Sequence, residues 1–273
     1  MALDRDPRDL LAVAGQILDG VADRFVDGVG APGSVPKGPD DFATDVDLEL
    51  ERRLTRELEE RTGIAVHGEE FGGPDLRSGT AWVVDPIDGT LNYSAGLPTC
   101  GILLALVDDG VPILGLTWLP LLGMRFAAAA GGPLLRNGDP LPALTHRSLD
   151  SAIVATGPLN PDSRGRIPGP FRVELFTELT RASSRVRMHG STGFDLALTA
   201  AGVLGGAVVF GRNAWDNAPG VALVRASGGV VTDLSGAPWT IASDSVLAAA
   251  PGVHQEILDI LDGVRQRERR DAQ

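Results

Sequence analysis

The segment AWVVDPIDGTLNY (81–93) ends an apolar run on two aspartates, Asp85 and Asp88. Proline pushes the preceding residue into an extended conformation and cannot donate a hydrogen bond within a sheet, so we expect a strand that ends at Asp85. The two carboxylates then lie three residues apart on a turn, where they can share hard cations. The carbonyl of Ile87, between them, offers a further oxygen ligand.

Gly89 and Thr90 follow directly and can open a helix or a tight turn. Backbone N–H groups at such a position point outward and suit an anion such as phosphate. Asp85 and Asp88 are equally typical of turns and helix caps. The hexapeptide alone leaves both interpretations open.

Three other segments place carboxylates at the ends of predicted strands or the starts of predicted helices. HGEEF contains Glu69 and Glu70, NAWDNAPG contains Asp216, and DDFATDVD contains Asp45. Each alone fits a solvated surface or a helix cap. Together they supply the oxygen ligands that magnesium requires, whereas zinc prefers nitrogen or sulfur donors and the 4 histidines of the chain are scattered.

Composition limits the classes of partner and compartment. The chain has 273 residues and a formal charge of −12, and its isoelectric point lies near 4.7. Such a surface repels phosphate backbones and anionic lipids, so we expect neither nucleic acid nor a membrane as a partner. A single cysteine, Cys100, excludes a disulfide framework, and no apolar run is long enough to span a bilayer. We therefore expect a soluble, cytoplasmic protein.

The elements that must position these carboxylates follow from apolar periodicity and turn residues. Helices are predicted over 6–29 and 45–61, the second with an apolar stripe that includes Leu50 and Leu54, and the Gly- and Pro-rich stretch 28–41 is typical of a loop. Asn137-Gly138 predicts a hairpin turn. Strands are predicted over 64–67, 81–85, 101–119 (two strands around 109–110) and 125–130.

The second part of the chain alternates strands with helices. The predicted order is strand 152–157, helix 171–182, strand 185–188, helix 191–203, strand 206–211, helix 217–229, strand 230–234 and a helix from 251. This alternation predicts layered α/β packing. We expect an N-terminal part over 1–142 that carries most of the metal ligands and a C-terminal part over 143–273 that carries Asp216 and substrate contacts.

GEE, DPIDGTLNY and WDNAPG, in this order, resemble the inositol monophosphatase family of magnesium-dependent, lithium-sensitive phosphatases. HGEEFGG and MHGSTG support the resemblance, which covers nearly the whole chain and looks especially close to the actinobacterial members. It implies an α/β (α+β) fold, the layered αβαβα sandwich of the inositol monophosphatase and fructose bisphosphatase type. Homodimers are common in families of this kind, so a homodimer is expected.

The resemblance implies a set of metal ligands in this sequence. Glu69, Asp85 and the carbonyl of Ile87 would hold one Mg²⁺. Asp85 would bridge to a second ion held with Asp88 and Asp216, and Glu69 would reach a third, weaker ion through water. Such a site activates a water molecule and neutralises charge on the leaving oxygen, so no covalent enzyme intermediate is needed.

The same resemblance implies catalytic and substrate-binding residues. Glu69 would act with the metals, and Thr90 together with Asp45 would orient and deprotonate the attacking water. Ser191 and Thr192 fit a helix N-cap as well as a substrate contact. The full set of implied substrate contacts is Asp88, Gly89, Thr90, Gly190, Ser191, Thr192 and Asp216.

The chain departs from the family pattern at Val209, where inositol phosphatases carry a glutamate that binds ring hydroxyls. Arg212 could substitute for it or recruit a second anionic group. Pro219 replaces a frequent alanine and is acceptable in the first turn of a helix. Lys37 is either a phosphate contact or an ordinary loop lysine.

Three functions fit these residues. The first is hydrolysis of inositol 1-phosphate to myo-inositol and phosphate. The second is the same chemistry on histidinol phosphate, a sugar bisphosphate or a 3′-phosphoadenosine compound, and Val209 keeps it open. The third is a metal-dependent binding or regulatory protein with little turnover, although every ligand position is filled. The apolar stretch 118–122 fits either a dimer interface or the core.

Overall fold

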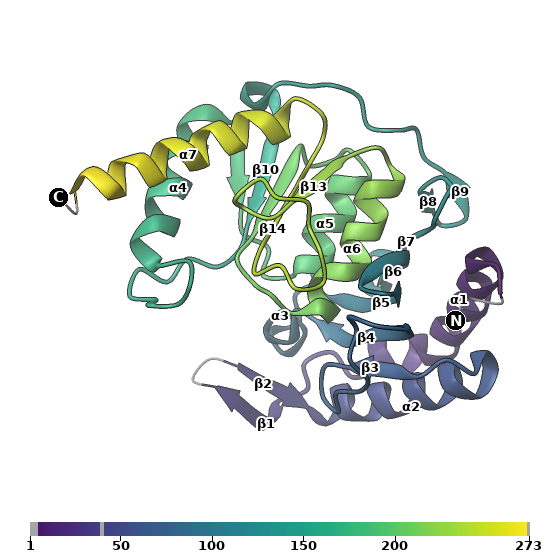
Figure 1. Cartoon of the computed structure of the whole chain (residues 1–273). Coiled ribbons are helices and arrows are strands. Elements are labelled where there is room, and N and C mark those ends of the chain that lie inside the picture. The colour runs from purple at the N-terminus through teal and green to yellow at the C-terminus, as the bar shows by residue number, and fades with distance from the viewer. Residues whose placement is uncertain (1–4, 39–40, 272–273) are drawn as a thin grey trace.

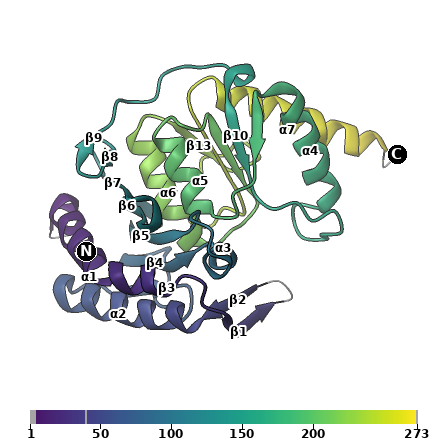
Figure 2. The same cartoon turned by 180° about the vertical axis from the view of Figure 1, so that it is seen from behind.

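The computed structural model describes residues 5–38 and 41–271. They form five layers, in which helices and sheets alternate as helix, sheet, helix, sheet, helix (Figure 1). The first helix, α1, lies in one outer layer, and the last helix, α7, lies in the other (Figure 2). The predicted layered αβαβα sandwich is confirmed.

Helices α1 (Pro7–Asp27) and α2 (Asp45–Thr62) cover the outer face of the first sheet. The apolar stripe of α2 is buried as its periodicity predicts, with Leu50, Leu54 and Leu58 at most 1% exposed. Thr44 caps the helix in a capping box, in which Thr44 and Asp47 each accept the backbone N–H of the other. The cap fixes where α2 begins and turns the Asp47 side chain back toward the sheet.

The first sheet has seven strands in the order β3-β4-β5-β6-β7-β8-β9. β3 and β4 are parallel, and all other neighbouring pairs are antiparallel. The predicted turn at Asn137 and Gly138 joins β8 to β9, and both residues have positive φ as a tight hairpin requires. The strands are β3 (Val66–Gly68), β4 (Thr80–Asp88), β5 (Gly101–Asp108), β6 (Val111–Leu119), β7 (Met124–Ala129), β8 (Leu135–Arg136) and β9 (Asp139–Pro140).

Strand β4 does not end at Asp85, so that expectation is wrong. Asp85 pairs with Leu103 and Asp88 with Gly101, which leaves two residues of β4 opposite one residue of β5. The proline lies in this bulge, where no ladder hydrogen bond is required of it. The strand therefore continues to Asp88 and carries both aspartates to the same end of the sheet.

Helices α5 (Thr192–Ala200) and α6 (Ala214–Ala226) form the middle layer between the two sheets. α6 lies directly on β6. The approach is so close that a Cβ atom at Gly115 of β6 would overlap the carbonyl oxygen of Pro219 of α6. The helix begins at Ala214, before the predicted start, so Pro219 lies inside it and not in its first turn. The proline therefore leaves the carbonyl of Trp215 without its usual helical N–H partner.

The second sheet has the order β11-β10-β12-β14-β13 and is covered on its outer face by two helices. β10 is parallel to β11 and β12, whereas β14 is antiparallel to both of its neighbours. The apolar run that forms β14 was not predicted as a strand, because it is short and does not alternate with polar residues. The elements are β10 (Ile153–Thr156), α4 (Gly169–Ala182), β11 (Arg185–Arg187), β12 (Gly206–Val209), β13 (Val230–Thr232), β14 (Val246–Ala249) and α7 (Val253–Asp271).

The stretch 28–41 was expected to be a loop, but most of a β-hairpin lies within it. β1 (Gly33–Gly38) pairs antiparallel with β2 (Asp41–Thr44) and projects from the body of the protein (Figures 1 and 2). Every residue of β1 is exposed, so the apolar alternation that signals a strand is missing. The remaining short helices are α3 (Thr90–Ala95), η1 (Pro120–Leu122) and η2 (Leu149–Ser151).

The apolar stretch 118–122 divides between core and surface. Leu119 is fully buried, whereas Trp118 and Pro120 line an apolar cavity of about 770 Å³ between α1 and the first sheet. In the part of the chain that the structure describes, no helix is both long and apolar enough to cross a membrane. The middle layer packs against both sheets, so the division into 1–142 and 143–273 stays a prediction.

Candidate metal centre and active site

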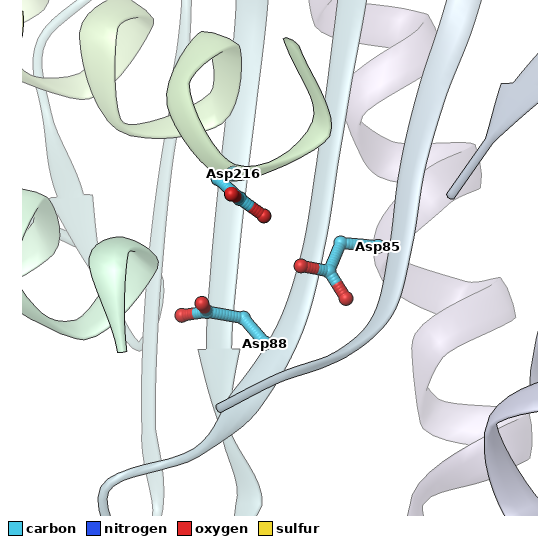
Figure 3. A group of neighbouring side chains, drawn as sticks. All are labelled: Asp85, Asp88 and Asp216. Carbon is cyan, nitrogen blue, oxygen red and sulfur yellow. The ribbon is translucent and has the colours of Figure 1, made fainter. Parts of the chain in front are cut away.

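Three aspartates from two elements meet at the carboxyl end of β4. Asp85 and Asp88 come from β4, and Asp216 comes from the first turn of α6 (Figure 3). One carboxylate oxygen of each lies within 4.8 Å of those of the other two. The structure thus brings together three of the predicted ligands from positions more than a hundred residues apart in sequence.

Burial and mutual repulsion disfavour the charged forms of these side chains. The pKa of Asp85 lies well above its ordinary value because the group is buried and because Glu69, Asp88 and Asp216 add negative charge around it. Burial, then the charges of Asp88 and Glu69, raise the pKa of Asp216 in the same way. The site therefore holds more negative charge than the protein compensates, which favours a bound cation.

Asp88 is held by the start of α5. Its carboxylate accepts hydrogen bonds from the Ser191 hydroxyl, from Thr192 N at 3.1 Å and from Gly193 N at 2.8 Å. These bonds oppose the effect of burial, which nevertheless raises the pKa of Asp88 to about 6. A Cβ atom at Gly193 would lie 2.3 Å from the Leu103 side chain and 2.9 Å from the Asp88 carboxylate, so glycine makes room for both.

The GSTG segment serves as the helix N-cap, one of its two predicted roles, and the substrate contact stays a prediction. The Ser191 hydroxyl caps α5 by accepting the N–H of Phe194 and donates to Asp88, so it is already engaged on both sides. Gly190 has a positive φ of 75°, and the preceding carbonyl accepts a hydrogen bond from Asn92 of α3. The segment thus links α3, α5 and Asp88 in one network.

Glu69 lies beside the three aspartates and is bound to a lysine. Lys37 Nζ donates to Glu69 Oε1 at 2.7 Å and to Glu70 Oε1 at 2.5 Å. The lysine at the end of the β1–β2 hairpin is therefore neither free nor a plain loop residue. Its ammonium group compensates part of the negative charge of this edge of the site.

Thr90 is paired with Asp47 and not with Asp45. Its Oγ1 lies 3.0 Å from the carbonyl oxygen of Ile87 and 3.5 Å from Asp47 Oδ1. Asp47 is fully buried, whereas Asp45 is exposed on the first turn of α2. The sequence interpretation took the aspartate directly before the helix, although the spacing Thr44-x-x-Asp47 of a capping box marks the one that turns inward.

The backbone at Gly89 has the conformation that the sequence suggests. Gly89 precedes α3 with a φ of 81°, a region that favours glycine, and an added Cβ would lie 3.2 Å from that of Ser191. Thr90 begins α3, so the start of this short helix faces the same end of β4 as the aspartates. The predicted phosphate-binding residues thus adjoin the predicted ligands.

Val209 and Arg212, the two candidates for substrate selection, lie in different environments. Val209 is 6% exposed, pairs with Val246 and belongs to the apolar cluster between the sheets. Arg212 is exposed, just before α6. The position where the family pattern has a glutamate is therefore part of the core in this chain.

The donor set fits a hard cation. The candidate ligands are carboxylates and one main-chain carbonyl, so all of them are oxygen donors. Among the described residues, the group of side chains that meets here consists of aspartates alone. Oxygen ligands suit Mg²⁺ and Ca²⁺, whereas zinc and copper sites use nitrogen or sulfur. These residues can therefore hold Mg²⁺, with water molecules completing its octahedral coordination.

The sequence model of the inositol monophosphatase family matches residues 7–265. This chain belongs to that family. The resemblance inferred from GEE, DPIDGTLNY and WDNAPG is confirmed. The family assignment covers both outer layers and both sheets of the fold.

Individual relatives and solved structures agree with this family assignment. The protein is 57% identical over 252 residues to inositol-1-monophosphatase ImpA of Mycolicibacterium smegmatis, over 92% of this chain and 91% of that one. It is 30% identical over 228 residues to a fructose-1,6-bisphosphatase/inositol-1-monophosphatase of Thermotoga maritima, over 82% and 84% of the two chains. The solved structure of the Thermotoga maritima IMPase has a TM-score of 0.85 at 26% identity, over 95% and 99%.

The charge of the cluster predicts how Mg²⁺ and pH act together on stability. The pKa of Asp88 rises from its ordinary 3.8 in the unfolded chain to about 6 in the fold, so the metal-free protein loses stability as pH rises through this window. Mg²⁺ binds the ionised carboxylates and removes that cost. Thermal unfolding should therefore show a larger Mg²⁺-induced stabilisation at about pH 7.5 than at about pH 4.5, near 2.7 kcal/mol at 100 times the Kd.

Asp88→Asn should lose most of this Mg²⁺ effect, whereas Asp45→Asn, at an exposed position, should retain it. A Mg²⁺ effect of equal size at both pH values would contradict the assignment of the aspartates as its source.

Burial of Val209 predicts that a glutamate there is destabilising. Val209→Glu should lower the free energy of unfolding by about 3 kcal/mol, because an uncompensated carboxylate would enter the apolar cluster. Val209→Met, of similar length without charge, should cost much less. Chemical denaturation measures both; a glutamate variant as stable as the methionine variant, with improved kcat/KM for inositol 1-phosphate, would place position 209 against the substrate.

Proposed function

We propose that this protein is a Mg²⁺-dependent phosphomonoester hydrolase that converts inositol 1-phosphate to myo-inositol and phosphate. The observation that carries the proposal is the buried cluster of Asp85, Asp88 and Asp216 in a member of the inositol monophosphatase family. The name of the relative at 57% identity, inositol-1-monophosphatase ImpA, supports the same substrate. Every carboxylate that the reaction requires is present.

Two ions would share the cluster. Glu69, Asp85 and the carbonyl of Ile87 would hold one Mg²⁺, and Asp85, Asp88 and Asp216 a second, with a third, weaker ion reached by Glu69 through water. When bound, the ions activate a water molecule and neutralise charge on the phosphate and the leaving oxygen. Lithium would inhibit by taking one of these positions.

Thr90 and Asp47 would prepare the attacking water. Asp47 would accept the hydroxyl hydrogen of Thr90 in place of the Ile87 carbonyl, which lies 3.0 Å from Thr90 Oγ1 and would instead face the ion. Thr90 Oγ1 would then be able to accept a hydrogen bond from the water. The water oxygen would then attack phosphorus and its proton would pass toward Thr90 and Asp47. The inositol oxygen would leave with the electron pair of the broken P–O bond and take a proton from a second water molecule. Support comes from the 3.5 Å distance between Thr90 Oγ1 and Asp47 Oδ1.

The phosphate would lie at the start of α3, where the N–H groups of Gly89 and Thr90 donate to its oxygens. The polyol would lie beyond Asp88, beside Gly190 and Asp216. The Ser191 hydroxyl and the Thr192 N–H group already hold Asp88, so these two groups would shape this side through Asp88 and not by contacting the substrate themselves. In this arrangement Asp88 and Asp216 contact both metal and substrate.

A second substrate class, a sugar bisphosphate, is favoured by two observations. Val209 offers no hydrogen bond to an inositol ring, and the name of the Thermotoga maritima relative combines inositol-1-monophosphatase with fructose-1,6-bisphosphatase. Arg212, exposed before α6, could bind a second phosphate. The chemistry at phosphorus would be unchanged.

We further infer a cytoplasmic homodimer. The support for the cytoplasm is the single, free cysteine. The support for self-association is the partly exposed apolar stretch 118–122 beside the cavity on the first sheet, in which Leu119 alone is fully buried. The charge of −12 argues against a nucleic-acid or membrane partner. Light scattering on the purified chain tests the dimer.

Exchange of two neighbouring aspartates tests the water-activating pair. Asp47→Asn should lower kcat at saturating Mg²⁺ by about 10² to 10³, since the amide cannot take up a proton. Asp45→Asn, on the same turn of α2 but exposed, should keep nearly full activity. The reverse result, with Asp45→Asn inactive and Asp47→Asn active, would restore the original assignment.

The proposed function itself is tested by kcat/KM over a panel of phosphate esters. Inositol 1-phosphate should give the highest value, above fructose 1,6-bisphosphate, histidinol phosphate and 3′-phosphoadenosine 5′-phosphate. EDTA should abolish turnover, millimolar Mg²⁺ should restore it, and Li⁺ should lower it. Turnover that is indifferent to EDTA would sink the metal mechanism, and no turnover of any ester would favour the binding or regulatory alternative.

A further inference from the structure

Glu51 is a fully buried carboxylate on α2 to which the proposed reaction gives no role. Its Oε2 accepts the backbone N–H of Glu70 at 2.8 Å, and its Oε1 accepts that of Phe71 at 2.9 Å. Both oxygens are therefore spent on the turn that follows β3. Glu69 is the first residue of that turn.

The turn is short and closed on itself. Gly68 N donates to Gly72 O at 2.9 Å, and Gly72 N donates back to Gly68 O at 3.1 Å. Glu69 N donates to Val84 O of β4 at 3.1 Å, which ties the start of the turn to the strand that carries Asp85. Glu51 holds the next two N–H groups from the opposite side, so the backbone at Glu69 is fixed from both β4 and α2.

Gly68 shows how closely the turn lies against this carboxylate. A Cβ atom at position 68 would overlap Glu51 Oε1 and Cδ. Its φ is not positive, so the glycine is required by this contact and not by an unusual backbone conformation. The glycine in GEE thus makes room for Glu51.

We propose that Glu51 is a positioning residue, which fixes the turn 69–71 so that the Glu69 carboxylate faces Asp85 and the metal cluster. This inference rests on the proposed role of Glu69 as a metal ligand. A carboxylate is suited to the task because it offers two acceptor oxygens to two N–H donors, whereas an amide offers one and turns an NH₂ group toward the other donor. Burial raises the pKa of Glu51 to about 7, a cost that the two N–H bonds offset in part.

The test is Glu51→Gln, with metal binding as its readout. Isothermal titration of the metal-free chain with Mn²⁺ should show a Kd about 10-fold weaker than in the wild type, the effect of losing a partner that orients a ligand. At saturating Mg²⁺ the variant should recover most of its kcat, because the substitution perturbs the placement of the Glu69 ligand and leaves the Thr90–Asp47 pair unchanged. Glu49→Gln, an exposed glutamate on the same helix that pairs with Arg24, is the matched control and should bind Mn²⁺ like the wild type.

Gly68→Ala perturbs the same contact from the other side and should weaken Mn²⁺ binding by a similar factor. A folded Glu51→Gln variant with wild-type Mn²⁺ affinity would overturn this inference and leave the proposed function standing. A wild-type chain that binds neither Mn²⁺ nor Mg²⁺ would overturn it together with the proposed function. Amide exchange on the wild type tests it without any variant: the N–H groups of Glu70 and Phe71 should be protected, and fast exchange of both would refute the contact.

Discussion

The site is organised around carboxylates that repel one another. Asp85, Asp88 and Asp216 have oxygens within 4.8 Å of each other in a largely buried position, and burial and proximity raise their pKa values. Such a cluster stays in place only if other groups hold each side chain. The start of α5 holds Asp88 with three hydrogen bonds, and Lys37 holds Glu69. A bound cation would complete this arrangement.

The layered fold is what brings these side chains together against their repulsion. β4 of the first sheet supplies two aspartates, and the middle layer supplies the third from α6 and the hydrogen bonds from α5. Close packing of this layer depends on glycines: Gly115 lets α6 lie on β6, and Gly193 lets α5 reach Asp88. Because the middle layer comes from the second half of the chain, neither half could build the site alone.

The substrate side of the site is less constrained than the metal side. The predicted phosphate-binding residues Gly89 and Thr90 are tied to β4 and α3, so they would serve any phosphomonoester substrate. In the proposed arrangement, discrimination among alcohols would come from the residues beyond Asp88, and Val209 is buried in the apolar cluster between the sheets. The structure thus explains why the chemistry at phosphorus is easier to infer than the alcohol attached to it.

The sequence by itself determined the family and the alternation of strands and helices in the second half of the chain, and it named the three aspartates that the structure brings together, because motifs and apolar periodicity are local patterns. It did not reveal β14 or the β1–β2 hairpin, which lack an apolar alternation, nor the passage of β4 through its proline, which depends on a bulge against β5. The sequence also pointed to Asp45 as the partner of Thr90, whereas the structure places Asp47 beside it. Two aspartates two residues apart on a helix start differ only in the direction they face, and the capping box and packing against the sheet decide that direction. Tertiary structure alone showed which carboxylates are buried, and hence that Glu51 supports the turn of Glu69.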